Sequence, residues 1–338
     1  MRRFSIVTLA LAVCGAVIPV AAQQACPGLT VVVNSPEDQL MLAVNGADNP
    51  QDQVAALDKY AAAHADAPAM TCANELYTAA YVKLNDFAKA ITYGEKDLAA
   101  NYLSVNLMVN LMKAYVGAGQ ATDNAFDLIA KAPDRIKAEA NPARPVNASD
   151  AEWKTNLEAW AAAAKDQRAY MEYAFFVLIG RVTDPNKRIQ DLDAFTKAYP
   201  DSPNLAQAYT QYLVAYTMLN NPAKADEYGE KAIAADPTNV AALNLVADNY
   251  ATRGVNLDKA EADAKKVLEM VPAAKKPEGA SDADFQAQQN TEMGAAHLTL
   301  GYVEYRRASR THRVAGAIEQ FKVAVNLLSG NPNLQARA

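Results

Sequence analysis

The stretch that decides the fold is Asn220–Pro237, NNPAKADEYGEKAIAADP, which recurs earlier in the chain as Leu84–Asn101, LNDFAKAITYGEKDLAAN. The identical residues share one offset, which for the two tyrosines is 228 − 93 = 135. The matched pairs are Ala223/Ala88, Lys224/Lys89, Ala225/Ala90, Tyr228/Tyr93, Gly229/Gly94, Glu230/Glu95, Lys231/Lys96, Ala234/Ala99 and Ala235/Ala100. A constant offset over so many pairs indicates an internal duplication, and the apolar spacing within each copy predicts helices.

The duplication extends well beyond this stretch. Asp184–Pro203 matches Asn49–Pro68 at the same offset, and the offset slips to 276 − 144 = 132 where Lys276–Phe285 matches Arg144–Trp153. Each half is therefore predicted to contain three helix pairs and a proline-containing insertion that leads into a long helix. The long helix is expected to start near Ala151 in the first copy and near Ala283 in the second. We expect a first half over residues 49–150 with its insertion at 133–150, and a second half over 151–338 with its insertion at 272–282. A segment with a short helix from Pro36, residues 23–48, precedes them.

The first 22 residues have the pattern of a secretory signal peptide. Two arginines follow Met1, the run from Ile6 to Val20 is apolar, and Ala21 and Ala22 are small. The apolar run is too short to span a bilayer comfortably, because a spanning helix needs roughly 20 apolar residues. We expect cleavage after Ala22 and a periplasmic or secreted protein. A lipid anchor at Cys26 is not expected, because the Gln23-Gln24-Ala25 that precedes it lacks a leucine-like residue.

Charge and cysteine content constrain the partners and the chemistry. The chain carries 32 Lys plus Arg and 38 Asp plus Glu, a net charge of −6. Removal of the leader deletes two arginines and gives 30 − 38 = −8, which argues against a nucleic-acid ligand. Cleavage would also leave two cysteines, Cys26 and Cys72. They could form a single disulfide in an oxidising compartment or remain as two buried thiols, and the sequence does not decide between these.

Small and aromatic residues recur at fixed places within each helix pair. Counted back from Pro237, the positions 4, 7, 11, 20, 27 and 32 of one unit are Tyr209, Tyr212, Tyr216, Ala225, Ala232 and Pro237. This pattern resembles the tetratricopeptide repeat (TPR), a helix pair with a period of about 34 residues. The resemblance implies an all-α, right-handed superhelical solenoid of roughly six to eight antiparallel helix pairs, built as two tandem duplicated halves. It also implies a protein or peptide partner in a groove lined by the first helix of each pair, helix A.

The groove positions of the expected A helices are mostly polar. They are Asn106, Asn110 and Lys113 in one pair, Gln207, Thr210 and Gln211 in another, and Asn244 and Asp248 in the next. Amide side chains could bind an extended peptide backbone or a carbohydrate, and a merely solvated face remains an alternative. Tyr81, Tyr115, Tyr216 and Tyr250, by contrast, all fall on packing position 11 of their units, so they are predicted to be core residues.

A basic tract, RRASRTHR, lies in the last expected inter-helix loop. Its arginines are Arg306, Arg307, Arg310 and Arg313. Such a tract could hold an anionic partner, or it could simply be a solvated loop, because clustered like charges repel one another.

The sequence carries no recognisable catalytic or metal-binding motif. The three histidines, His64, His297 and His312, are scattered, and HExxH, GxSxG and glycine-rich phosphate loops are absent from the printed sequence. We therefore expect no enzyme activity, no cofactor and no metal. The predicted function is a noncovalent protein-binding scaffold of a bacterial cell envelope; the alternatives are a carbohydrate- or envelope-polymer-binding module and an unrecognised envelope hydrolase. The oligomeric state cannot be predicted.

Overall fold

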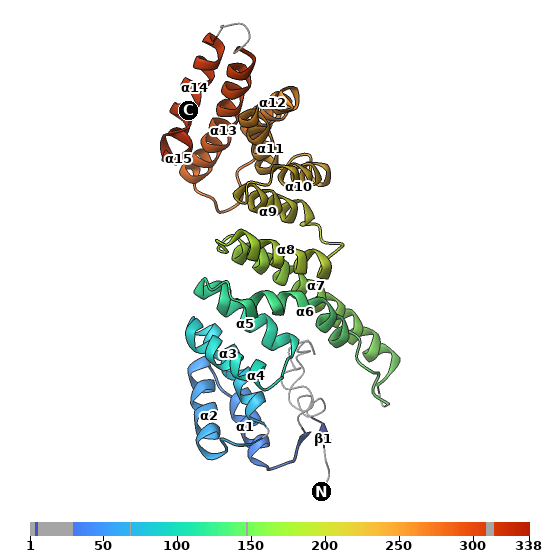
Figure 1. The fold of residues 1–338 in the computed structure, drawn as a ribbon. Coiled ribbons are helices and arrows are strands. Elements are labelled where there is room, and N and C mark those ends of the chain that lie inside the picture. The colour runs from blue at the N-terminus through green and yellow to red at the C-terminus, as the bar shows by residue number, and fades with distance from the viewer. Residues whose placement is uncertain (1–3, 6–29, 68, 147, 309–313) are drawn as a thin grey trace. The chain divides into compact units, whose positions relative to one another are not determined.

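The structure is a computed structural model that describes residues 4–5, 30–67, 69–146, 148–308 and 314–338. The chain divides into two compact units, Met1–Thr183 with Lys197–Tyr199, and Asp184–Thr196 with Pro200–Ala338. The described part is helical apart from one short pair of strands, as Figure 1 shows. The all-α fold class is therefore confirmed, whereas the right-handed superhelical course of the whole chain stays a prediction.

The first unit contains seven helices among its described residues. Its elements are β1 (Phe4–Ser5), β2 (Thr30–Val31), α1 (Pro36–Asn45), α2 (Pro50–Ala63), α3 (Met70–Lys83), α4 (Phe87–Ala99), α5 (Val105–Ala118), α6 (Asp123–Ala140) and α7 (Asp150–Ile179). The two-residue strands pair antiparallel. Strand β1 lies within the predicted signal peptide, most of which falls outside the described residues, so the leader stays a prediction.

The second unit begins with α8 and repeats the same helix order. Its elements are α8 (Pro185–Ala198), α9 (Leu205–Met218), α10 (Pro222–Ala235), α11 (Val240–Arg253), α12 (Leu257–Ala273), α13 (Asp282–Ala308), α14 (Ala315–Leu327), the short 3₁₀ helix η3 (Leu328–Gly330) and α15 (Pro332–Gln335). The long helices α7 and α13 begin within one residue of the predicted starts.

Each unit is a series of helix pairs. In the first unit α3 packs on α4 and α5, and α5 packs on α6 and α7; in the second, α9 packs on α10 and α11, and α11 packs on α12 and α13. Each of these A helices thus contacts its own second helix, helix B, and the next A helix. Neighbouring pairs bury the core between them, as in a helical repeat protein.

The turn from A to B is built the same way in four pairs. A residue one or two positions after the A helix has a positive φ in each of these turns, at Asn85, Gly119, Asn220 and Gly254. These positions are spaced by 119 − 85 = 34 and 254 − 220 = 34 residues. In each turn the next backbone N–H donates to the carbonyl of the tyrosine near the end of the A helix, for example Asp86 N to Tyr81 O at 3.0 Å and Asn221 N to Tyr216 O at 2.9 Å. This is the left-handed helix cap that asparagine and glycine favour.

A stack of three tyrosines packs within the α3–α4 pair and within its counterpart, the α9–α10 pair. The rings of Tyr77 and Tyr93 lie 4.1 Å apart at an interplanar angle of 15°, and Tyr81 stacks on Tyr93 at 5.7 Å. Their counterparts repeat the arrangement, with Tyr212 and Tyr228 4.2 Å apart at 17°. Tyr81, Tyr115 and Tyr250 are buried and Tyr216 is half-buried, which agrees with the predicted packing role.

The glycine after the middle tyrosine allows helix B to approach the next A helix. A Cβ at Gly229 would lie 2.4 Å from Val246 Cγ2, and one at Gly94 would lie 2.8 Å from Leu111 Cδ1. Real side chains do not tolerate such distances, because protein interiors are closely packed. The repeated Tyr-Gly dipeptide is therefore explained by helix packing.

The first insertion begins later than the sequence suggests, because Pro133 lies inside α6. Proline has no N–H to donate to the carbonyl four residues earlier, which normally breaks a helix. Here the Tyr199 hydroxyl donates to the Ile129 carbonyl at 2.9 Å and replaces the missing bond. Pro272 likewise lies inside α12, so the non-helical parts of the insertions are confined to residues 141–149 and 274–281.

Candidate partner-binding site

The predicted groove residues of the first unit form one stripe on α5. Asn106 and Asn110 are half-buried and Lys113 is exposed. The Lys113 ammonium lies 5.9 Å from the centroid of the Tyr170 ring on α7. The intervening Leu107 and Leu111 are fully buried, so the stripe is the polar edge of a helix whose other face is core.

The start of α5 is fixed by two carboxylates from neighbouring helices. Ser104 caps α5, accepting from Leu107 N at 2.9 Å, and its hydroxyl donates to Glu75 of α3 at 2.8 Å. Glu139 of α6 accepts from Val105 N at 3.2 Å. Satisfying the free N–H groups of a helix start stabilises it, so these contacts position the polar stripe that follows.

Glu75 belongs to a buried acidic cluster that the sequence analysis did not identify. It also accepts from the Tyr102 hydroxyl at 2.5 Å, and nearby Asp97 of α4 accepts from Asn74 Nδ2 at 3.0 Å. Asp97 is fully buried. Burial raises the pKa of Asp97 to about 7; the hydrogen bond from Asn74 lowers the pKa and the charge of Glu75 raises it. The sequence signal was an aspartate at a repeat position that normally holds alanine.

The groove residues on α9 do not all face solvent. Gln207 is exposed and Gln211 is half-buried, but Thr210 is only 6% exposed. The Thr210 hydroxyl donates to Ala206 O at 2.9 Å and accepts from Asn239 Nδ2 at 3.1 Å. Thr210 is thus a packing residue that ties α9 to the start of α11, and it is dropped from the proposed contact surface.

The two groove residues on α11 are already engaged by the chain itself. Asn244 Nδ2 donates to the Glu292 carbonyl of α13 at 3.1 Å. Asp248 accepts from Arg337 through both carboxylate oxygens, at 2.8 and 3.2 Å. Arg337 follows α15, so the segment Asn331–Ala338, here called the tail segment, lies against the predicted binding face of α11.

The predicted anion-binding arginines have internal partners where they are described. Arg306 and Arg307 lie on α13 and not in the loop, which corrects that placement. Arg306 donates to the Thr252 carbonyl, and Arg307 bridges Asp258 and Glu261 of α12. Arg310 and Arg313 lie outside the described residues. The anionic-partner patch stays a prediction, and two of its four arginines already hold helices together.

The disulfide between Cys26 and Cys72 stays one of the two alternatives that the sequence leaves open. Cys72 is buried in α3, with 2% of its surface exposed. Cys26 lies outside the described residues.

The tyrosine hydroxyls mark a second feature that sequence analysis missed. Tyr77 donates to Asp58 and Tyr212 to Asp193, each at 2.6 Å, and both aspartates sit one helix earlier in the chain. Burial, together with this bond to a carboxylate, raises the pKa of both tyrosines. The two aspartates share the 135-residue offset (193 − 58 = 135), so the duplication itself carried the signal.

Among the residues that the structure describes, no set of three or more His, Cys, Asp and Glu side chains is placed to hold a metal ion. No helix among them combines the length and the apolar character needed to cross a bilayer.

The geometry defines the class of the protein, a TPR-like helical repeat protein, and comparisons with known proteins add little beyond it. Neither the protein-family comparison nor the comparison with curated proteins finds a match. A thermophilic TPR protein of Thermus thermophilus matches at 16% identity and a TM-score of 0.24, covering 77% of this chain and 99% of that chain. The C-terminal part of a TPR repeat-containing protein from Cytophaga hutchinsonii matches at 17% identity and a TM-score of 0.35, covering 78% of this chain and 98% of that chain. At these TM-scores the matches carry no argument, and the classification rests on the helix pairs and the 34-residue spacing.

Proposed function

We propose that this chain is a non-enzymatic scaffold that binds partner polypeptides along its A helices. The observation that carries the proposal is the stripe Asn106, Asn110 and Lys113 on α5, which is accessible to solvent beside a fully buried face. Amide side chains both donate and accept hydrogen bonds, so such a stripe can bind an extended peptide backbone. Helix-pair repeats present such stripes on a rigid support, and no chemical step is needed.

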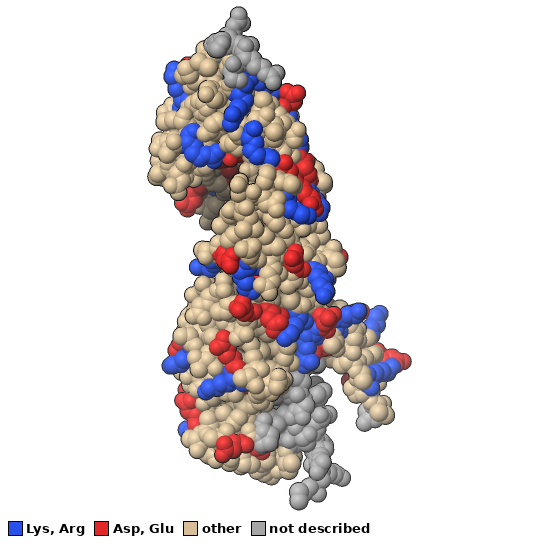
Figure 2. All heavy atoms as spheres, in the orientation of Figure 1, with Lys and Arg blue, Asp and Glu red and all other residues tan. Residues whose placement is uncertain are grey.

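The charge distribution also favours a protein partner over nucleic acid. The chain is acidic overall, with a net charge of −6. On the face drawn in Figure 2, basic and acidic side chains are interspersed. Nucleic-acid binding depends on basic patches that neutralise phosphates, and an interspersed pattern does not supply them.

The proposed location is the bacterial cell envelope, and it rests on the predicted leader. Residues 1–22 carry the signal-peptide pattern described above.

Site-specific photo-crosslinking tests the proposal. A photoreactive amino acid replaces Asn110 on α5, and the matched control replaces Thr92, an exposed residue on the B helix α4. We expect position 110 to crosslink to one or a few defined polypeptides in envelope extract and position 92 to crosslink to none of them. Equal labelling from both positions would contradict a binding face on the A helices. Recovery of polysaccharide without protein would favour the carbohydrate-binding alternative.

A further inference from the structure

The tail segment is held in the second unit by contacts that resemble recognition of a ligand. Arg337 places its guanidinium on the Asp248 carboxylate and 5.9 Å from the centroid of the Tyr302 ring. The Tyr302 hydroxyl donates to the Arg337 carbonyl at 3.0 Å. Asp248 belongs to α11 and Tyr302 to α13, which are two consecutive A helices. Both the side chain and the backbone carbonyl of Arg337 are therefore bound at a predicted groove position.

These contacts select arginine rather than any positive charge. A guanidinium spreads its charge over a flat group that can lie on an aromatic ring while its N–H groups bind a carboxylate. A lysine ammonium reproduces the charge but not this combined geometry. The predicted groove face of α11 carries Asn244, Leu245 and Asp248. Asp248 is the one carboxylate among these three residues, so its charge complements that of a bound cation.

The tail segment itself is weakly anchored. Helix α15 has four residues and none of them is buried. Its remaining attachments are Leu334 and Ala338, which pack partly buried on the cluster of Leu298 and Leu328, and a hydrogen bond from Gln335 Nε2 to Val325 O at 3.0 Å. The Arg337–Asp248 pair is itself partly exposed, with 37% and 24% of the side chains accessible. Exposed ion pairs contribute little stability, so this segment can be displaced at low cost.

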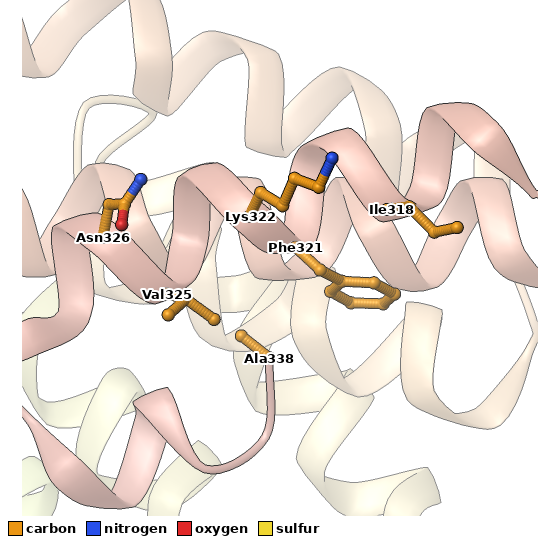
Figure 3. Close-up of a pocket in the computed structure, with 6 residues that line it drawn as sticks. All are labelled: Ile318, Phe321, Lys322, Val325, Asn326 and Ala338. Carbon is orange, nitrogen blue, oxygen red and sulfur yellow. The ribbon is translucent and has the colours of Figure 1, made fainter.

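Beside the tail segment lies space that the small side chain of Ala338 does not fill. Figure 3 shows Ala338 beside Val325 and Phe321 of α14, and the pocket of about 500 Å³ at this place is also lined by Ile318 and Lys322. Ile318 and Val325 are 47% and 37% exposed. A larger apolar side chain in place of the alanine would bury part of this surface, which is favourable in proportion to the apolar area removed from water.

We propose that Asp248 and Tyr302 form a receptor site for a partner peptide that carries arginine followed by a large apolar residue, and that the tail segment occupies this site as an internal competitor. The inference rests on the proposed scaffold function, since it names the partner chemistry at one of its groove positions. A tethered competitor lowers the apparent affinity of every external ligand, because it is present at a high effective concentration.

The test measures binding of a fluorescent peptide, NPNLQARL, which has the sequence of residues 331–338 with leucine in place of Ala338. The full chain is compared with a release variant, Leu334→Ser with Arg337→Ala, that unseats the segment. We expect the release variant to bind the peptide at least tenfold more tightly than the unchanged chain. Adding Asp248→Asn to the release variant is expected to abolish that gain, and the peptides NPNLQAKL and NPNLQAAL are expected to bind progressively more weakly. Glu269→Gln, at an exposed position of α12 away from this pocket, serves as the control and is expected to leave binding unchanged.

Equal binding by the unchanged chain and the release variant would overturn the proposal, as would binding that survives Asp248→Asn. Circular dichroism confirms that each variant is folded, and Arg337→Ala alone replaces the release variant if the double substitution unfolds. Crosslinking from position 110 in the first unit is independent of this site. If position 110 still crosslinks specifically but the peptide assay fails, only the inference about the Asp248 and Tyr302 site is wrong. If position-specific crosslinking is absent, the proposed scaffold function is wrong.

Discussion

The α3–α4 pair and the α9–α10 pair share their tyrosine stack but differ in one buried layer. At the 135-residue offset, Asn74, Glu75 and Asp97 of the first pair correspond to Tyr209, Thr210 and Ala232 of the second. Asp97 and Ala232 are both fully buried. The same helix pair therefore forms with a carboxyl group or with a methyl group in that layer. The stack and the turns are what the repeat requires, while the acidic layer is a property of the first unit alone.

Removing the most deeply buried tyrosine of either stack is expected to have the largest effect. Tyr77→Ala and Tyr212→Ala should each lower the free energy of unfolding by about 3–5 kcal/mol, because each deletes a buried aromatic ring and leaves a cavity. The exposed fractions of the two side chains are 1% and 2%, so the two losses should be similar. Urea unfolding followed by circular dichroism measures both. Both tryptophans lie on α7, so their fluorescence reports on the first unit.

Tyr173→Ala is the matched control for these substitutions. Tyr173 is 58% exposed on α7 and should change stability little. A large loss in one stack and none in the other would contradict the equivalence of the two pairs.

The acidic layer predicts a pH dependence that originates in the first unit. The pKa of Asp97 is raised from 3.8 to about 7, so between these values the unfolded chain is ionised while the folded chain keeps its proton. Folding then binds a proton, and the contribution of Asp97 to stability is fully present below pH 3.8 and is lost as the pH rises through about 7. Asp97→Asn, which can still accept from Asn74, should therefore be more stable than the unchanged chain at pH 8, with the advantage shrinking by roughly 2–3 kcal/mol at pH 5.

Urea unfolding at the two pH values, followed by tryptophan fluorescence, measures this difference. Ala232→Ser in the second unit is the control, because its side chain does not titrate. An advantage of Asp97→Asn that is the same at both pH values would show that Asp97 is ionised in the folded chain.

The fold was predictable from the sequence because its signals are local. Helical spacing and the asparagine or glycine that follows four of the A helices act within one helix pair. The Tyr-Gly dipeptide acts between one pair and the next, and the duplication displays all of these signals twice. The acidic layer depends instead on Tyr102 and Ser104 turning back onto Glu75, which lies on another helix. Continuation of α6 past Pro133 likewise depends on Tyr199, a residue 66 positions later by 199 − 133.

The candidate site was predictable only in part, for the same reason. Exposure of Asn110 and Lys113 follows from helical periodicity on a single helix. Burial of Thr210 requires Asn239 from a different helix, and occupation of Asp248 requires a tail segment too short to show any periodicity. Long-range contacts of single side chains leave no repeating pattern in a sequence, so they could not be predicted from it.

A smaller effect is expected at Gly94 and Gly229, where helix B approaches the next A helix in both units. Gly229→Ala should lower the free energy of unfolding by about 1–3 kcal/mol, because the new Cβ would lie 2.4 Å from Val246 Cγ2 and β-branched valine adapts poorly. Gly94→Ala should cost less, since its Cβ meets a terminal methyl of Leu111 at 2.8 Å and leucine can change rotamer. Thermal unfolding of the two variants compares them, and a larger loss for Gly94→Ala would reverse the predicted order.

The smallest effect is expected from removing one hydroxyl of each stack. Tyr77→Phe and Tyr212→Phe keep the stacked rings but leave Asp58 and Asp193 without the hydroxyl that donates to them at 2.6 Å. A hydrogen bond to a charged group contributes about 1.5–3 kcal/mol when buried, and both aspartates lie in partly solvated surroundings, so we expect losses of about 1–2 kcal/mol. The Tyr212 hydroxyl also lies 3.4 Å from Thr196 Oγ1, which can turn toward Asp193 once the tyrosine hydroxyl is gone. Tyr212→Phe should therefore lower the free energy of unfolding less than Tyr77→Phe does. Urea unfolding of both variants, with Tyr173→Phe as the control, shows whether Thr196 replaces the lost donor.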